Sequence, residues 1–193
     1  MLKLNVNNIF YSIQGEGLRT GTANIFIRLA GCNLSCEFCD TNFIRGREYC
    51  LDELQRLIKQ HYPCKNIIWT GGEPTLQLNE EIIDYFKLLG YYQAIETNGS
   101  NSVPGNIDFV TVSPKKQINI TIRRADEIKI IYPHCFKPEI LDSINIECKA
   151  ILLSPCFDGD KINVSYLKEC LRLIKQNPNY RLSMQVHKLI GIE

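Results

Sequence analysis

Short apolar segments of strand length alternate with longer segments of helical periodicity along most of this chain. After an extended segment at 2–13, apolar runs predict strands at 25–29, 66–69, 92–96, 107–112, 127–131, 149–153 and 180–186. Apolar residues at helical spacing predict helices at about 51–61, 78–89 and 167–174, with a weaker one around 137–144. Such alternation is typical of an α/β fold with a largely parallel sheet.

The length of the chain limits which α/β architecture it can adopt. A complete (β/α) barrel needs about 250 residues, whereas this chain has 193. The connections at 97–106 and 113–126 are too short or too polar for full helices. We therefore predict a shortened, incomplete (β/α) barrel with a mostly parallel sheet and few helices. Because no linker, repeat or low-complexity tract interrupts the chain, we predict a single domain over 1–193.

Charge and apolar patterning exclude several classes of partner. The net charge is +1, from 22 basic and 21 acidic residues, so the composition does not favour broad binding to nucleic acid or to a membrane surface. No apolar run approaches the roughly 20 residues of a membrane span, and the N-terminal segment lacks the apolar core of a signal peptide. We therefore expect a cytoplasmic protein with no nucleic-acid or membrane partner.

Three cysteines gather in one short loop directly after the strand at 25–29. Cys32, Cys36 and Cys39 are separated by three and then two residues, and a loop this short can turn its three sulfurs toward one centre. The chain has nine cysteines, and in a cytosolic protein a high, odd count favours metal or catalytic use over disulfides. Three protein ligands leave one position open. Spacing alone allows an iron–sulfur cluster or a zinc ion with a distant fourth ligand.

Polar and glycine-rich motifs follow several of the other predicted strands. Residues 70–74 contain two adjacent glycines, which let a backbone approach a ligand closely or simply form a tight turn. Residues 13–17 place an amide and a carboxylate in a glycine-flanked loop, which could bind a polar heterocycle or lie in solvent. Because ligands bind at the carboxyl ends of parallel strands, we expect these motifs to converge on one site.

Three further positions carry side chains that suit binding. Arg28 lies within an apolar strand, where it serves either as an anion clamp or in a salt bridge. Ser113 and Lys115 flank a proline at a strand end, and they could hold a ribose or carboxylate or cap a turn. His187 follows the last predicted strand, and a lone histidine is more often structural than catalytic.

The Cys-x3-Cys-x2-Cys loop, together with the downstream Gly-Gly-Glu-Pro sequence, resembles the radical S-adenosylmethionine superfamily. The full series of motifs is similar, nearly end to end, to the 7-carboxy-7-deazaguanine synthases within it. The motifs that carry this resemblance are 13–17, 39–41, 70–74, 96–99, 113–115 and 181–188.

The resemblance implies an activity and a set of cofactors. The implied reaction is the radical ring contraction of 6-carboxy-5,6,7,8-tetrahydropterin to 7-carboxy-7-deazaguanine with loss of ammonia, a lyase step in queuosine-type tRNA base biosynthesis. It also implies a [4Fe–4S] cluster on Cys32, Cys36 and Cys39, S-adenosylmethionine, and Mg²⁺ at Thr41. Expected partners are a reductant protein such as flavodoxin or ferredoxin and a second copy of the chain. Alternatives are a glycyl-radical-activating enzyme and a non-catalytic zinc or iron–sulfur module.

The resemblance also assigns binding residues and leaves the chemistry to the cluster and cofactor, with no catalytic side chain. It implies pterin contacts at Ile13, Gln14, Gly15, Glu16, Arg28, Thr70, His187 and, through the terminal carboxylate, Glu193. It implies S-adenosylmethionine contacts at Phe38, Gly72, Glu73, Ser113, Pro114, Lys115, Ser154, Pro155 and Asp158.

Overall fold

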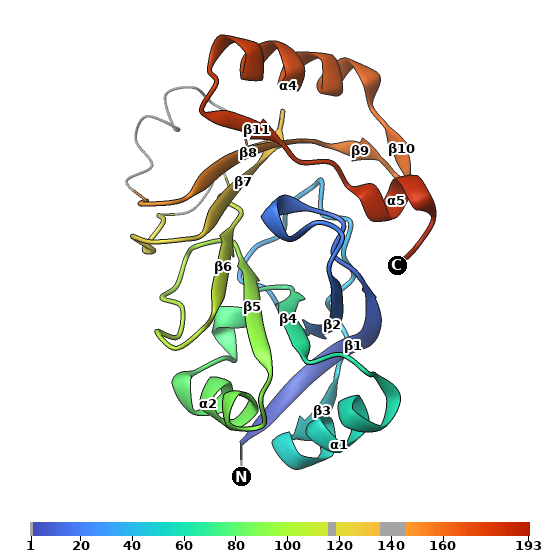
Figure 1. Ribbon diagram of the computed structural model, residues 1–193, viewed down its shortest axis with the longest axis vertical. Helices are drawn as coiled ribbons and strands as arrows, with labels where there is room; N and C mark the ends of the chain where they lie inside the picture. The colour runs from blue at the N-terminus through green and yellow to red at the C-terminus, as the bar shows by residue number, and fades with distance from the viewer. Residues whose placement is uncertain (1, 116–118, 136–145) are drawn as a thin grey trace. The chain divides into compact units, whose positions relative to one another are not determined.

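The computed structural model describes residues 2–115, 119–135 and 146–193. These residues group into two compact units, and each is described by itself (Figure 1). The first unit contains residues 2–12, 23–97 and 101–110, and the second contains 13–22, 98–100 and the described residues from 111 onward. The single domain predicted for residues 1–193 stays a prediction.

The first unit is built on strands in the order β5-β4-β2-β1-β3. Strand β4 is parallel to both β2 and β5, and β3 is antiparallel to β1. The register of β2 against β4 sets Arg28 opposite Thr70. The strands are β1 (Lys3–Ile13), β2 (Ala23–Leu29), β3 (Arg47–Cys50), β4 (Asn66–Gly71) and β5 (Tyr92–Thr97).

Helices α1 (Leu51–His61) and α2 (Glu80–Leu88) form the main apolar core of the first unit together with its strands. Leu54 and Ile58 from α1, and Ile83 and Phe86 from α2, are fully buried against Trp69 of β4. Their spacing of three or four residues puts each pair on one helix face, so the pattern that predicted the helices also builds this core. The short helix η2 (Pro74–Leu76) follows β4.

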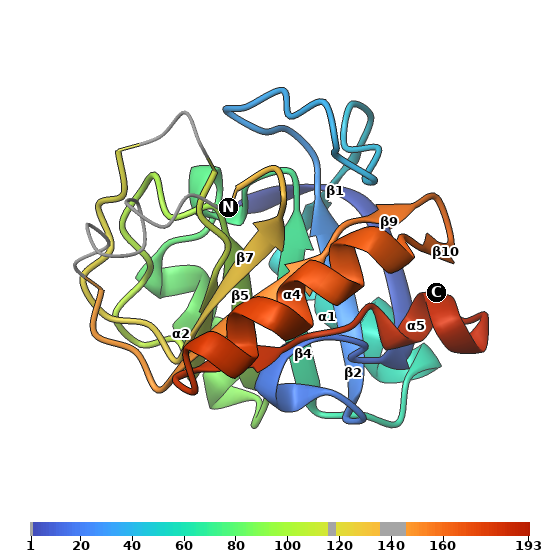
Figure 2. The same ribbon diagram turned by 90° about the horizontal axis from the view of Figure 1, so that it is seen from above.

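The second unit has strands in the order β11-β8-β7-β6, and these strands pair in parallel. Helix α4 packs on β8 and β11 and buries Cys170. Figure 2 shows this helix from above. Strands β9 and β10 form a separate antiparallel hairpin. The elements are η1 (Gly17–Arg19), β6 (Phe109–Val112), β7 (Glu127–Tyr132), β8 (Ala150–Pro155), β9 (Phe157–Asp158), β10 (Lys161–Ile162), α4 (Val164–Gln176), β11 (Tyr180–Leu182) and α5 (Val186–Ile190).

Most predicted elements are present, but the C-terminal part differs from the prediction. The strand predicted over 180–186 ends at Leu182, and Val186–Ile190 forms helix α5, so His187 lies on a helix. Apolar residues at 186, 189 and 190 have helical spacing, which the alternating pattern just before them masks. The strand predicted to stop at 153 continues through Pro155.

Helix starts also differ, for a local reason. Helix α4 begins at Val164 rather than at residue 167, because the Asn163 side-chain oxygen caps it by accepting the Tyr166 N–H at 3.0 Å. Asn79 caps α2 in the same way, so this helix begins at Glu80 rather than at residue 78. The helix predicted around 137–144 lies outside the described residues. Within the described part of the chain, no helix has the length and apolar character needed to cross a membrane.

The packing of α2 predicts different effects on stability for two substitutions in this helix. Ile83 is 0% exposed and Leu88 is 88% exposed on the same helix. We expect Ile83→Ala to lower the free energy of unfolding by about 2–5 kcal/mol, since it opens a cavity in the core. Leu88→Ala should change it by less than about 0.5 kcal/mol. Urea unfolding of both variants under reducing conditions measures the difference, and equal losses would contradict the described burial.

Candidate active site

The cysteine loop follows β2 in the first unit. Cys32 and Cys36 are half-buried and Cys39 is exposed. The Cys39 N–H donates to the Cys36 carbonyl oxygen at 3.1 Å, which closes a turn between these two residues. Cys36 and Cys39 line a hollow of about 540 Å³, together with Asp40 and Thr41. Burial raises the pKa of the Cys32 thiol. The loop thus holds the sulfurs of Cys36 and Cys39 beside an open space rather than in the core.

The base of this loop is fixed by the glycine pair that follows β4. The Gly72 N–H donates to the Leu29 carbonyl oxygen at 3.1 Å, and the Glu73 N–H donates to the Gly31 carbonyl oxygen at 2.9 Å. A Cβ atom at Gly72 would lie 1.9 Å from that Gly31 oxygen. Only glycine fits this approach, so the Gly-Gly motif and the cysteine loop form one backbone arrangement.

The Glu73 side chain accepts hydrogen bonds that the sequence did not predict. Its side chain is 0% exposed, and its Oε1 accepts from the Thr75 N–H at 3.1 Å, the Thr75 hydroxyl at 2.6 Å and the Thr97 hydroxyl at 2.7 Å. A buried carboxylate requires such donors. The carboxylate therefore stabilises the start of η2 and fixes the turn that carries Gly72.

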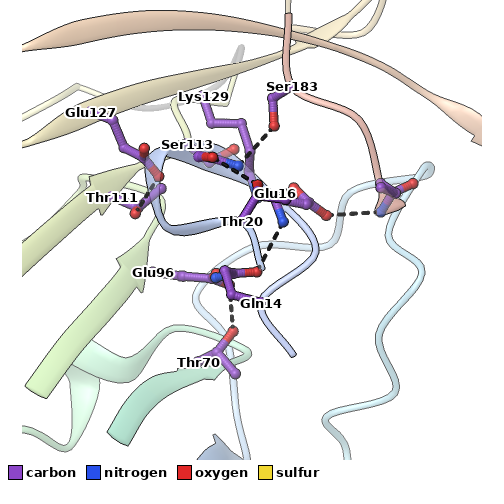
Figure 3. Close-up of polar contacts among 12 residues, drawn as sticks. Gln14, Glu16, Thr20, Thr70, Glu96, Thr111, Ser113, Glu127, Lys129 and Ser183 are labelled. Carbon is purple, nitrogen blue, oxygen red and sulfur yellow. Dashed lines mark hydrogen bonds and ion pairs between the residues drawn. The ribbon is translucent and has the colours of Figure 1, made fainter. Parts of the chain in front are cut away.

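A second polar group in the first unit lies on strands β2, β4 and β5 and on the residues after the cysteines. Arg28 Nη1 donates to Thr41 Oγ1 at 3.0 Å, and its guanidinium carbon lies 5.6 Å from the ring centroid of Phe10. Across the register from Arg28, the Thr70 hydroxyl donates to Glu96 Oε2 at 3.0 Å (Figure 3). Sequence reasoning singled out Arg28, Thr41 and Thr70. It missed Glu96, although that residue opens a polar motif at the end of a strand.

In the second unit, the Gln14–Gly17 loop packs on the C-terminal segment. The Val186 N–H donates to the Gly15 carbonyl oxygen at 3.0 Å. A Cβ atom at Gly15 would lie 2.2 Å from His187 Nδ1, so the loop and this imidazole are in close contact. The Gln14 side-chain oxygen accepts the Glu16 N–H at 3.1 Å. The structure thus brings together Gln14, Gly15, Glu16 and His187, as the sequence predicted.

The Glu16 carboxylate is the centre of this group. It forms an ion pair with Lys129, and its Oε1 accepts from Gln185 Nε2 at 3.1 Å. Burial by itself raises the pKa of this carboxyl, but the charge of Lys129, the hydrogen bonds from Lys129 and Gln185 and the charge of His187 together lower the pKa below its usual value. Glu16 is therefore ionised at neutral pH and accepts hydrogen bonds without donating any.

The backbone of the same loop has its own anchors. The Gly17 N–H donates to Ser183 Oγ at 3.0 Å, and the Leu18 N–H donates to Glu127 Oε2 at 2.6 Å. The other oxygen of the buried Glu127 carboxylate accepts from the Thr111 hydroxyl at 2.8 Å (Figure 3). Ser183, Glu127 and Thr111 were not identified from the sequence. Ser183 lies within the 181–188 motif, but its partner and that of Glu127 are backbone N–H groups far away in the chain, which the sequence does not reveal.

The residues predicted to contact S-adenosylmethionine fall in both units. Phe38, Gly72 and Glu73 belong to the first unit, and 113–115 and 154–158 belong to the second. Lys115 Nζ donates to Ser113 Oγ at 2.8 Å. Ser154 and Pro155 are buried at the end of β8, and Asp158 accepts from Asn163 Nδ2 at 2.9 Å. Glu193 is exposed beyond α5.

The cysteine loop carries the thiolate donors that suit an iron–sulfur cluster. In the described ranges, no three thiol, imidazole or carboxylate groups are placed to hold one metal ion. A cluster binds each thiolate through a different iron, so its ligands stand further apart than those of one ion. Cys36 and Cys39 line the open hollow, and Cys32 is half-buried in the same loop. All nine cysteines lie in the described part and are thiols.

Thr41 and its neighbours offer oxygen atoms that suit a hard cation. The Thr41 hydroxyl lies 3.5 Å from Asp40 Oδ1, and both residues line the same hollow. Hydroxyl and carboxylate oxygens are the ligands that Mg²⁺ prefers. The Arg28 guanidinium uses one lone pair of the hydroxyl and leaves the other available.

Comparisons with known proteins bear on the family and on the fold. The sequence profile of the Radical SAM superfamily matches residues 26–150. Proteins named 7-carboxy-7-deazaguanine synthase are similar over nearly full length: the one from Bacteroides thetaiotaomicron is 40% identical, covering 97% of each chain, and the one from Haemophilus influenzae is 37% identical, covering 98% of this chain and 94% of the other. The crystal structure of QueE from Escherichia coli superposes with a TM-score of 0.79 at 27% identity, covering 96% of this chain and 95% of the other. The predicted α/β fold with mostly parallel strands and few helices is confirmed.

The glycine contact at the base of the cysteine loop gives a prediction about stability. In Gly72→Ala the new methyl group meets the Gly31 carbonyl oxygen, so the backbone must move, and we expect the free energy of unfolding to fall by about 1–3 kcal/mol. Gly105→Ala is the matched control, because the nearest atom there is a flexible Glu80 carboxylate oxygen at 3.3 Å. Denaturant unfolding of the two variants checks this. A Gly72→Ala variant as stable as the control would contradict the close approach.

Proposed function

Because the chain belongs to the radical S-adenosylmethionine superfamily and, within it, to the 7-carboxy-7-deazaguanine synthase family, we propose that it converts 6-carboxy-5,6,7,8-tetrahydropterin to 7-carboxy-7-deazaguanine and ammonia. The chain is thus a radical SAM enzyme, a lyase of queuosine-type base biosynthesis. The observation that carries the substrate assignment is the Gln14–Glu16 group, an amide beside a half-buried ionised carboxylate. Such a pair complements the donors and acceptors on the edge of a pterin ring.

The cysteine loop is proposed to hold a [4Fe–4S] cluster through Cys32, Cys36 and Cys39. When bound, the cluster and S-adenosylmethionine supply one-electron reduction and hydrogen-atom abstraction, chemistry that belongs to the cofactors. The role of the chain is to hold these groups and shield them. We assign the S-adenosylmethionine contacts to Phe38, the backbone at 72–73, and the segments 113–115 and 154–158, as the resemblance implies.

The proposed pterin contacts fall into those to the heterocycle and those to the substrate carboxylate. Glu16 and Gln14 are proposed to hydrogen-bond the heterocycle, with Ile13, Gly15, Thr70 and His187 around it. Arg28 is proposed to hold the substrate carboxylate, because a guanidinium pairs with a carboxylate through two parallel hydrogen bonds. Glu193 completes this proposed set.

Mg²⁺ is proposed to bind at Thr41 and to meet the substrate carboxylate beside Arg28. The oxygen atoms of Thr41 and Asp40 support this assignment. We further propose a homodimer, an electron-donor protein such as flavodoxin or ferredoxin, and a cytoplasmic location, for which the nine thiols are support.

The two alternatives raised by the sequence are not favoured. A glycyl-radical-activating enzyme or a non-catalytic metal module would leave the Gln14–Glu16 group without a ligand. Similarity over 97% of the chain to proteins named as synthases argues against both.

The proposed reaction is tested directly. The anaerobically reconstituted protein, with S-adenosylmethionine, dithionite, Mg²⁺ and carboxytetrahydropterin, should form 7-carboxy-7-deazaguanine, detected by mass spectrometry. The control is the variant with all three loop cysteines changed to serine, which should carry no cluster and form no product. A protein with about four irons per chain that yields no product would overturn the substrate assignment.

The Mg²⁺ site predicts the behaviour of two variants at one position. Thr41→Val keeps the shape of the side chain but removes its hydroxyl, so the Mg²⁺ concentration needed for half-maximal turnover should rise about 10-fold or more. Thr41→Ser keeps the hydroxyl and should stay close to the native enzyme. Iron content, measured on the same samples, should be equal in all three proteins. Loss of iron in Thr41→Val would count against separate sites for cluster and magnesium.

A further inference from the structure

Lys129 forms a shielded ion pair that the sequence motifs do not include. It lies on β7, and its ammonium contacts the Glu16 carboxylate. The two side chains are 12% and 14% exposed, so water does not screen the pair strongly. For comparison, Lys149 pairs with Asp126 at 2.7 Å but is 74% exposed. The Lys129 pair is therefore the kind of contact whose loss leaves a buried charge without its counterion.

The carboxylate of Glu16 is held from two sides. Lys129 contacts Oε2, and Gln185 Nε2 donates to Oε1 at 3.1 Å. An ionised carboxylate has about four lone-pair sites. These two donors therefore orient the group and still leave acceptor capacity on both oxygens.

Lys129 contacts the Glu16 carboxylate, whereas other residues hold the backbone of the Gln14–Gly17 loop. Side chains two positions apart share one face of a strand, so Lys129 and Glu127 extend from the same face of β7. Glu127 accepts the Leu18 N–H, and Ser183 accepts the Gly17 N–H. These two anchors remain when Lys129 is replaced, so the loop keeps its path while Glu16 loses its cation.

We infer that Lys129 is a positioning residue for pterin recognition: together with Gln185 it fixes the ionised Glu16 carboxylate in one orientation, so that the remaining lone pairs accept N–H groups of the substrate ring. This inference rests on the proposed function and deepens it. A pterin ring presents an amino group and a ring N–H on one edge, and both are donors. An acceptor-only group that cannot rotate selects such an edge over one that presents acceptors.

The test begins with Lys129→Met, which keeps most of the side-chain volume and removes the charge. We expect KM for carboxytetrahydropterin to rise on the order of 10- to 100-fold, the effect of losing a hydrogen bond to a charged group. Iron content and cleavage of S-adenosylmethionine without pterin should stay within about twofold. Lys149→Met is the matched control and should leave KM unchanged, because its ion pair is exposed. An unchanged KM in folded Lys129→Met would overturn the inference.

A second measurement separates positioning from general structure. If Lys129 acts through Glu16, adding Lys129→Met to the Glu16→Gln variant should change KM by less than about twofold, because the acceptor is already altered. An added effect as large as in the native background would overturn the inference. Should Lys129→Met fail to fold, Gln185→Met removes the other donor and should raise KM; no rise there would equally overturn it.

The same experiments separate the two proposals. If the native enzyme neither binds nor converts the pterin, both the proposed function and the inference are wrong. If the native enzyme converts the pterin but KM is unchanged in both Lys129→Met and Gln185→Met, only the inferred role of Lys129 is wrong.

Discussion

The parallel pairing of β2 with β4 is the constraint on which the cysteine loop of this protein depends. Their register brings the end of β4 beside the end of β2, so the Gly72 and Glu73 amides bond to the carbonyl oxygens of Leu29 and Gly31. A side chain at Gly72 would enter the space of the Gly31 oxygen. Because the cysteine loop starts at this contact, the position of the thiols follows from backbone hydrogen bonds and from the absence of one Cβ atom. The buried Glu73 carboxylate then stabilises the turn from behind.

In the second unit, carboxylates shielded from water fix the Gln14–Gly17 loop. Glu16 and Glu127 are carboxylates removed from water, and each needs donors to offset the loss of hydration. Glu127 takes the Leu18 amide and the Thr111 hydroxyl, whereas Glu16 takes Lys129 and Gln185. The first set shapes the backbone of the Gln14–Gly17 loop, and the second orients one side chain on it. This division lets a recognition loop be rigid in its path and still present a charged acceptor.

Membership of the synthase family gives these arrangements a common purpose. A radical enzyme must hold its cofactors firmly and exclude competing reactions, since the hard chemistry is not done by side chains. Both the cysteine loop with its neighbours and the Gln14–Gly17 loop with its partners suit this demand. One unit offers thiols beside a hollow and oxygen ligands next to an arginine, and the other offers a fixed, ionised carboxylate and a packed imidazole.

Alternating strands and helices were sufficient to predict the α/β fold. The cysteine spacing, the glycine pair and the family resemblance singled out the cysteine loop and residues such as Arg28, Thr41 and Glu16, whose roles stay predictions. These signals are local, because periodicity and spacing are properties of neighbouring residues. The sequence could not show that 186–190 is helical, nor which partners Lys129, Gln185, Glu127, Ser183 and Glu96 bond to. Those residues act through partners more than twenty positions away. Only the tertiary fold, by bringing buried charges and backbone amides from distant segments together, decides which of them must pair.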